Sequence, residues 1–138
     1  MSSTERSVAD CLSLLESGIA HWTEWRASHP GARCDLSGQT LSHGYFFEAN
    51  FSQMNLSGVS FQRACLIGAD FSGADLSGAD LTGAYISDAN FCEANLSHAN
   101  FTGADLTRAD LRQAHLSETQ LTDADICTAQ LPTRDIAA

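Results

Sequence analysis

The chain has 138 residues, of which 43% are hydrophobic, and its formal net charge at pH 7 is −10. This length is typical of one domain. No apolar run approaches the length of a membrane span, and residues 1–9 lack the apolar core of a signal peptide, so we expect a cytoplasmic protein with no membrane contact. The acidic balance, with no basic patch, also argues against direct binding of nucleic acid.

Cysteine usage points to the same compartment. The five cysteines are odd in number and show no C-x-x-C spacing; they are Cys11, Cys34, Cys65, Cys92 and Cys127. Zinc sites and disulfide frameworks have paired spacings that this pattern lacks. We therefore expect all five cysteines to be reduced.

Residues 8–27 have the spacing of an amphipathic helix. The apolar stripe consists of Val8, Cys11, Leu12, Leu15, Ile19 and Trp22. Ser7 is the expected N-cap, and His29, Pro30 and Gly31 are expected to end the helix. Gly18 weakens its middle by about 1 kcal/mol relative to alanine. An amphipathic membrane or partner helix is the alternative, but the polar face is not basic. We expect this helix to cover the first turn of the structure that follows.

Residues 34–133 repeat with a period of five. The stretch 69–81 reads A-D-F-S-G-A-D-L-S-G-A-D-L. A large apolar residue recurs at every fifth position from Leu36 to Leu131, which makes 20 consecutive repeats. The residue two positions earlier is usually small, and the residue directly before is often Asp or Asn. Serine or threonine usually follows the large residue.

A period of five fits neither regular element. Five residues on an α-helix rotate successive apolar side chains by about 140°, so they share no face. On a flat strand an odd period sends alternate residues to opposite sides. Both problems disappear if the chain turns once per repeat, and glycine at the turn position suits type II turns, which require a positive φ. The pattern predicts a solenoid, because one such repeat cannot bury its apolar residue alone.

The motif resembles that of the pentapeptide-repeat family, with consensus A-[DN]-[LF]-[ST]-x, over all 20 repeats. The resemblance implies an all-β solenoid: a right-handed quadrilateral β-helix with four repeats per coil, hence about five coils here. We expect three parts, which are an N-terminal α-helical cap (1–33), the β-helix (34–133) and a short C-terminal tail (134–138). The period of 20 places Phe51, Phe71 and Phe91 in one column, and it places Asp88 beside Arg108 as a surface ion pair.

One face of the expected rod has unusual outward residues. They are apolar or aromatic over the first three coils: Tyr45, Phe47, Cys65, Ile67 and Tyr85. Single soluble domains seldom expose such a patch. Either the N-terminal segment folds back over it, or a protein partner binds there. These five residues are the candidate partner-binding site.

The acidic charge raises a second hypothesis. Residues 34–138 carry 13 acids and four arginines, which gives −9. Some pentapeptide-repeat proteins mimic DNA and bind a type II topoisomerase (DNA gyrase). A rod of about 24 Å would match some 14 phosphates, since duplex DNA carries one charge per ~1.7 Å. Asp is nevertheless the consensus residue, so the acidity also comes with the motif.

No feature of the sequence predicts catalysis. The histidines are scattered, and Asp105 and Asp125 share a column but most simply form a solvated pair. There is no nucleophile–base constellation, phosphate loop or zinc spacing. We expect no enzyme activity, no cofactor and no metal, and we take the chain to be a rigid rod that acts as a protein–protein interaction module.

The last coil has no visible lid. Six residues after Pro132 are too few for a stable helix. An uncovered solenoid end is an edge that proteins normally hide, and a second copy is the simplest cover. We therefore expect a homodimer through the last coil, with an interface made by Leu116, Leu121, Ile126 and Leu131.

Overall fold

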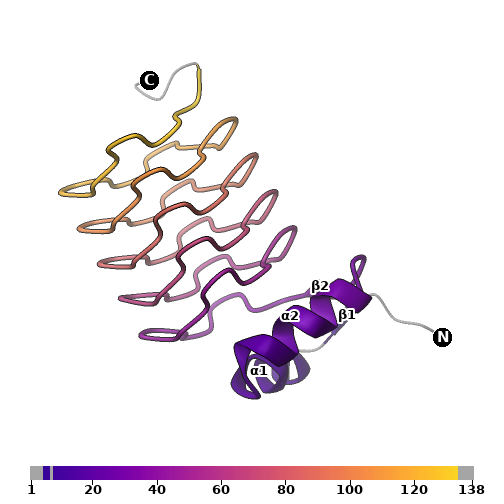
Figure 1. The fold of residues 1–138 in the computed structure, drawn as a ribbon. Helices are drawn as coiled ribbons and strands as arrows, with labels where there is room; N and C mark the ends of the chain where they lie inside the picture. The colour runs from indigo at the N-terminus through magenta and orange to yellow at the C-terminus, as the bar shows by residue number, and fades with distance from the viewer. Residues whose placement is uncertain (1–4, 7, 134–138) are drawn as a thin grey trace.

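The computed structural model describes residues 5–6 and 8–133 of the chain. Its helices and strands all lie before residue 35: β1 (Glu5–Arg6), α1 (Val8–Glu16), α2 (Ile19–Ser28) and β2 (Arg33–Cys34). β1 pairs in parallel with β2. Beyond β2 the chain winds into a rod of stacked coils, with the two helices at its N-terminal end (Figure 1).

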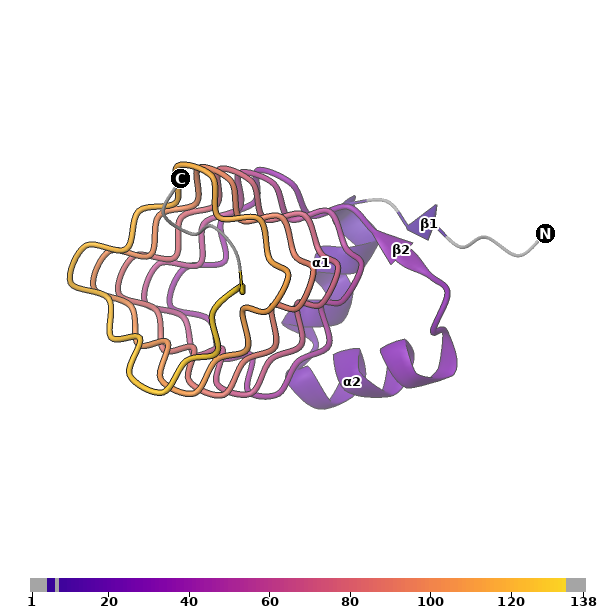
Figure 2. The same cartoon turned by 90° about the horizontal axis from the view of Figure 1, so that it is seen from above.

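The coils are held in register by parallel bridges between residues 20 positions apart. The series runs from Asp35↔Asn55 to Asp110↔Gln130. Each repeat donates and accepts backbone hydrogen bonds across the stack; the Phe71 amide, for example, donates to the Asn90 carbonyl at 2.7 Å. Twenty residues are four pentapeptides, so every repeat lies above the repeat four positions earlier. Figure 2 shows the coils lying one over another.

A tight turn follows the large apolar residue in each repeat. The amide of Ala74 donates to the carbonyl of Phe71 at 3.0 Å, which closes the turn. The residue before Ala74 is Gly73, whose φ is 68°. All seven glycines predicted for this position have a positive φ, as a type II turn requires. Twelve repeats place another residue there at φ between 56° and 65°, so the solenoid imposes the left-handed conformation even without glycine.

The Asp or Asn before the large residue has a structural task. Its side-chain oxygen accepts from the backbone amide two residues later, and often from the hydroxyl there as well. Asp70 Oδ1 accepts from the Ser72 amide at 2.9 Å and from the Ser72 hydroxyl at 2.7 Å. Asn100 does the same with Thr102. Because Asn and Asp form the same bonds, the fold requires an acceptor here but no negative charge.

The core consists of the residues predicted to face inward. Phe51, Phe71 and Phe91 are buried and form a stack, with ring centroids 5.4 and 5.0 Å apart. The small residues two positions earlier, such as Ala69, are buried beside them. The inward assignment and the phenylalanine column are thus confirmed. Leu41 is an exception: it occupies an inward position of the first coil and is only partly buried.

The helical end of the rod is attached through two residues of α2. Trp22 is buried, its ring lies 5.7 Å from that of Phe51, and its indole N–H donates to the Asn50 carbonyl at 3.0 Å. Arg26 is buried and donates to the carbonyls of Ala32 and Ser52, both at 3.0 Å. Burial lowers the pKa of Arg26 from its ordinary value. These bonds fix α2 on the first coils.

The predicted single helix over 8–27 is wrong. The structure has two helices, and Gly18 lies between them with φ 122° and ψ 151°. This conformation is open to glycine and strained for other residues, so the glycine expected only to weaken one helix separates two. The predicted end is confirmed: α2 ends at Ser28, and His29 is its C-cap residue. The predicted N-cap, Ser7, lies outside the described residues.

The expectation that all cysteines are reduced is also wrong. Cys11 of α1 and Cys34 of β2 form a disulfide, whereas Cys65, Cys92 and Cys127 are free. Both bonded cysteines are buried. The apolar stripe of the predicted helix placed Cys11 on its buried face. The sequence did not show that Cys34 lies next to Cys11 in the folded protein. The bond ties α1 to the beginning of the rod.

Within the part of the chain that the structure describes, no helix has both the length and the apolar character needed to cross a membrane. The predicted tail, 134–138, falls outside the described residues.

Candidate interaction surface

Five outward residues form one patch on the side of the rod. We call Tyr45, Phe47, Cys65, Ile67 and Tyr85 the aromatic patch. Bridges Tyr45↔Cys65 and Cys65↔Tyr85 align three of them in a column along the stack. The rings of Tyr45 and Phe47 stack with centroids 6.3 Å apart. The structure therefore brings the predicted residues together over adjacent coils.

The aromatic patch is open to solvent. Tyr45 is 64% exposed, Tyr85 is 55% exposed and Phe47 is 39% exposed. Cys65, between Tyr45 and Tyr85 in their column, and Ile67 are partly buried. Outward positions elsewhere carry mostly polar residues, so this exposure is specific to one face. Contiguous apolar surface of this kind marks interaction sites in soluble proteins.

Cover by the N-terminal segment was one of the two expectations for this patch. The described helices α1 and α2 instead lie at the end of the rod, against the first coils (Figure 1). Trp22 and Arg26 of α2 contact Phe51, Asn50 and Ser52, and Cys11 of α1 is bonded to Cys34. The patch rings stay exposed. For the described residues, that expectation is wrong.

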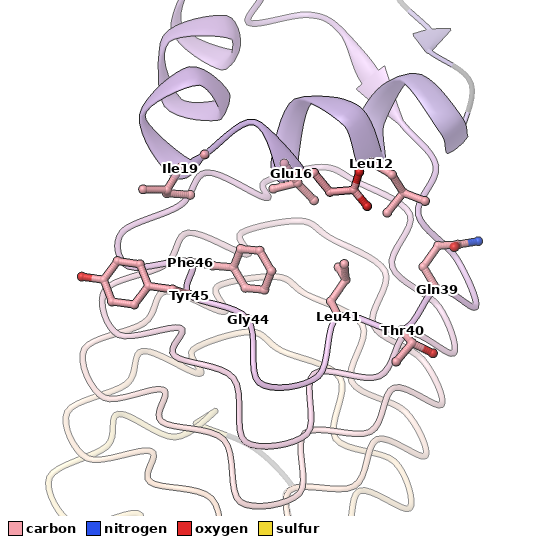
Figure 3. Close-up of a pocket in the computed structure, with 11 residues that line it drawn as sticks. Leu12, Glu16, Ile19, Gln39, Thr40, Leu41, Gly44, Tyr45 and Phe46 are labelled. Carbon is pink, nitrogen blue, oxygen red and sulfur yellow. The ribbon is translucent and has the colours of Figure 1, made fainter.

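A slot opens between the helices and the first coil, next to the aromatic patch. Leu12 and Glu16 of α1 and Ile19 of α2 line one wall, and Leu41 and Tyr45 belong to the other (Figure 3). Its volume is about 470 Å³. We call this space the cap slot. Sequence reasoning missed it because one continuous helix was expected to cover the first coil.

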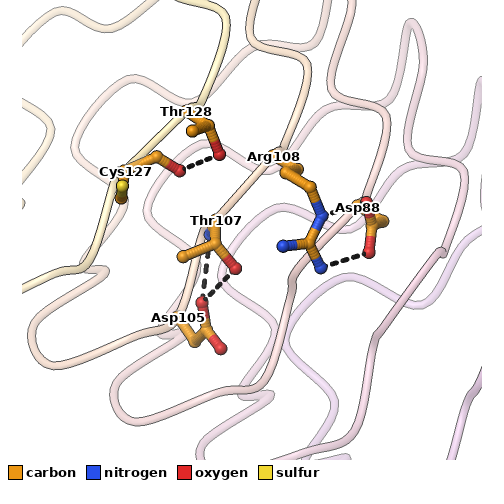
Figure 4. Close-up of polar contacts among 6 residues, drawn as sticks. All are labelled: Asp88, Asp105, Thr107, Arg108, Cys127 and Thr128. Carbon is orange, nitrogen blue, oxygen red and sulfur yellow. Dashed lines mark hydrogen bonds and ion pairs between the residues drawn. The ribbon is translucent and has the colours of Figure 1, made fainter.

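Charged groups border the aromatic patch toward the C-terminal end. Tyr85 is bridged to Asp105, whose carboxylate accepts from the amide and hydroxyl of Thr107. Arg108 and Asp88 lie beside them as the predicted ion pair, 2.9 Å apart (Figure 4). Hydrogen bonds from Arg108 lower the pKa of Asp88, and the same bonds raise the pKa of Arg108. An apolar centre with a polar border is the usual composition of a binding surface.

The last coil is less well buried than the middle of the rod. Ile126 is 38% exposed. Leu116, Leu121 and Leu131 are partly buried and pack against the core. These four residues belong to the predicted dimer interface.

The acids of the rod do not form an unbroken stripe. In the column 35, 55, 75, 95, 115 the residues are Asp, Asn, Asp, Asn and His, and in the column 50, 70, 90, 110, 130 they are Asn, Asp, Asn, Asp and Gln. In these two columns no acid is followed directly by another, whereas Asp105 and Asp125 are neighbours in a third column. Among the described residues, no group of three or more His, Cys, Asp or Glu side chains is placed to hold a metal ion.

The sequence profile described as "Pentapeptide repeats" matches eight copies, over residues 32–73, 74–113 and 94–131. The chain belongs to the pentapeptide-repeat family. Proteins of this family form right-handed quadrilateral β-helices, in agreement with the expected type of solenoid.

Solved structures of pentapeptide-repeat proteins are similar to this chain. One from the thylakoid lumen of Arabidopsis thaliana has 33% identity and a TM-score of 0.65, and the match covers 71% of this chain and 70% of the other. Rfr23 from the cyanobacterium Cyanothece 51142 has 30% identity and a TM-score of 0.43, covering 70% of this chain and 63% of the other. A comparison with curated proteins finds no match.

A third similar structure is QnrB1, a plasmid-mediated fluoroquinolone resistance protein. It has 20% identity and a TM-score of 0.35, and the match covers 77% of this chain and 66% of the other. With this TM-score the likeness carries no argument about this chain.

Proposed function

We propose that this protein is a non-enzymatic interaction module, a rigid rod that binds a protein partner through the aromatic patch. The observation that carries the proposal is the exposure of Tyr45 and Phe47 on the first coil and of Tyr85 two coils further along the same face. Tyrosine and phenylalanine are enriched in binding surfaces because they bury large apolar areas with few rotatable bonds. A regular backbone ladder holds the rings, so little conformational freedom is lost on binding.

Affinity capture from the source organism tests this proposal. The wild-type protein is compared with a Phe47→Asp, Ile67→Asp double variant. The matched control is Gln53→Asp, Gln113→Asp, which adds the same charge at exposed turn positions of another face. We expect a partner that the wild type and the control retain and the patch variant loses. Equal capture by all three proteins would contradict the proposal.

The DNA-mimic alternative, with a type II topoisomerase as partner, receives less support from the geometry. A mimic needs negative charges in series along the rod, comparable to one per ~1.7 Å in duplex DNA. Asp75 and Asp70 are instead followed along their columns by the neutral Asn95 and Asn90. The acids also serve as turn acceptors, which accounts for much of their number without a mimic role.

We also propose that residues 34–133 form five coils and that α1 and α2 cap the first one. The register of 20 residues supports the coil number. The burial of Trp22 against Phe51 and the Cys11–Cys34 bond support the cap. A cytoplasmic location stays a prediction, and this disulfide removes part of its basis, since disulfides form in oxidising compartments.

We propose, finally, that two copies pair end to end through the last coil. The exposure of Ile126 and the partial exposure of its neighbours support this proposal. Light scattering on the wild type and on Leu131→Glu tests it. We expect a dimer that the substitution dissociates, and a wild type that is monomeric at high micromolar concentration would contradict it.

A further inference from the structure

The cap slot is an unfilled end of the core. Along the column of Leu41, the next inward residues Phe61, Leu81 and Phe101 are buried. Leu41 is only partly buried because α1 stands away from it across the slot (Figure 3). The volume of about 470 Å³ lies within the usual range of ligand pockets. An apolar group from another molecule would complete the burial of this column.

The slot is held open by attachments on both sides of it. The disulfide from Cys11 fixes α1 directly before Leu12, the first residue of the slot. Trp22, three residues after Ile19, fixes α2 through its bond to the Asn50 carbonyl. The end of α1, Gly18 and the beginning of α2 lie between these anchors and line the slot. A preformed cavity binds with a smaller loss of conformational freedom than one that must open.

The negative charge of Glu16 at the slot favours a positively charged ligand. Glu16 is exposed at its wall, and no Lys, Arg or His is among the described residues that line the slot. The net charge of −10 adds to this negative potential. Carboxylates and phosphates are therefore poorly suited to the slot, whereas an apolar group next to a cation matches both its walls and its charge.

The position of the slot favours a polypeptide as the occupant. Tyr45 lines the slot and also begins the aromatic patch, where its ring stacks with that of Phe47. A chain bound over the patch therefore reaches the slot directly.

We infer that the cap slot receives a large apolar side chain of the protein partner, next to a lysine or arginine that pairs with Glu16. This inference rests on the proposed function and adds the chemistry of the partner. Apolar anchors in preformed pockets contribute much of the affinity of protein interfaces. A nearby opposite charge adds specificity and a faster association.

A random peptide library displayed on phage and selected on the full-length oxidised protein tests the inference. We expect selected peptides to contain a large apolar residue near Lys or Arg. The affinity of one selected peptide is then measured by fluorescence anisotropy. Glu16→Lys should weaken its binding at least about tenfold, and replacing the basic residue of the peptide with Glu should restore binding to that variant. Ser13→Lys is the matched control, because Ser13 is exposed on α1 but does not line the slot.

The possible results separate this inference from the proposed function. Peptides that lose binding to Phe47→Asp, Ile67→Asp but bind the Glu16→Lys variant normally would overturn the inference and leave the patch proposal standing. Equal weakening by Glu16→Lys and Ser13→Lys would show an effect of net charge alone, which also overturns it. Selected peptides that none of these variants weakens would contradict both proposals.

Discussion

Arg108 and Asp88 are 20 residues apart in the sequence, yet the guanidinium donates two hydrogen bonds of 2.9 Å to the carboxylate. The pair spans two stacked coils on the surface. It confirms the prediction from the period of 20 and shows that outward residues meet their counterparts in the next coil. Both side chains are well exposed, so the pair reports the register more than it stabilises the rod.

The first prediction follows from this pair. Arg108 lowers the pKa of Asp88 in the folded protein. The pair therefore stabilises the fold fully at pH values above the ordinary aspartate pKa of about 3.9. This stabilisation is lost as the pH falls through the lower pKa of the folded state. Arg108→Ala should raise the pKa of Asp88 toward the ordinary value, with little change in global stability. Carboxyl NMR titration measures this shift, with Arg63→Ala as the control. An unchanged pKa would be inconsistent with the pair.

The second prediction concerns the core. Phe71 is completely buried between Phe51 and Phe91. Phe71→Ala should lower the free energy of unfolding by about 3–5 kcal/mol, because it leaves a cavity in a close-packed stack. Ser77→Ala, at an outward position of the next repeat, loses one side-chain hydrogen bond and should cost about 1 kcal/mol or less. Denaturant melts with equal midpoints would contradict the inward and outward assignments.

The third prediction separates the charge of the repeat acids from their role as acceptors. Asp75 Oδ1 accepts from the amide and hydroxyl of Ser77 at 3.0 and 2.7 Å. Asp75→Asn keeps an oxygen that accepts both hydrogen bonds and should leave the free energy of unfolding nearly unchanged. Asp75→Ala loses both bonds and should lower the free energy of unfolding by about 1–2 kcal/mol. Urea melts of the two variants make the comparison. An equal loss in both would mean that the negative charge itself is required.

The structural features behind these predictions differ in how far they could be predicted from the sequence. The period of five and the turn glycines were sufficient to predict a solenoid and its inward residues, because both depend on position in a repeat. The Asp88–Arg108 contact also needed four repeats per coil, which the resemblance to the pentapeptide-repeat family implied. The repeat does not extend to residues 1–33. There the separation of two helices at Gly18 depends on backbone angles, and the Cys11–Cys34 bond depends on how α1 docks.

The candidate surface shows the same division. The aromatic patch could be predicted because its residues follow the columns of the repeat. The cap slot could not be predicted, since it results from where α1 and α2 are attached rather than from any motif. Leu41 illustrates the limit: its place in the repeat indicates an inward direction but not whether the neighbouring helix fills the space beside it.

The fourth prediction concerns the disulfide. Protein purified without reductant and alkylated in denaturant should show three reactive thiols, from Cys65, Cys92 and Cys127. Replacing both Cys11 and Cys34 with alanine should lower stability by about 2–4 kcal/mol, because the bond restrains the unfolded chain. Intact mass after alkylation counts the thiols, and five labelled cysteines would contradict the bond.

The fifth prediction concerns the proposed cap. Deleting residues 1–30 in a Cys34→Ser background removes Trp22 from Phe51 and uncovers the strand edges of the first coil. Exposed edges are templates for association, so the truncated protein should aggregate or oligomerise. Size-exclusion chromatography compares it with the full-length Cys34→Ser variant. A monomeric truncated protein with an unchanged melting temperature would argue against a cap.

Photo-crosslinking in cells of the source organism tests the central claim, that the aromatic patch binds a protein partner. A benzophenone amino acid replaces Tyr85, which is 55% exposed in the patch, or Gln53 on another face as the control. Irradiation should give one discrete crosslinked product from position 85, identified by mass spectrometry, and none of that mass from position 53. Identical crosslinking patterns from both positions, or no product from position 85, would contradict the claim.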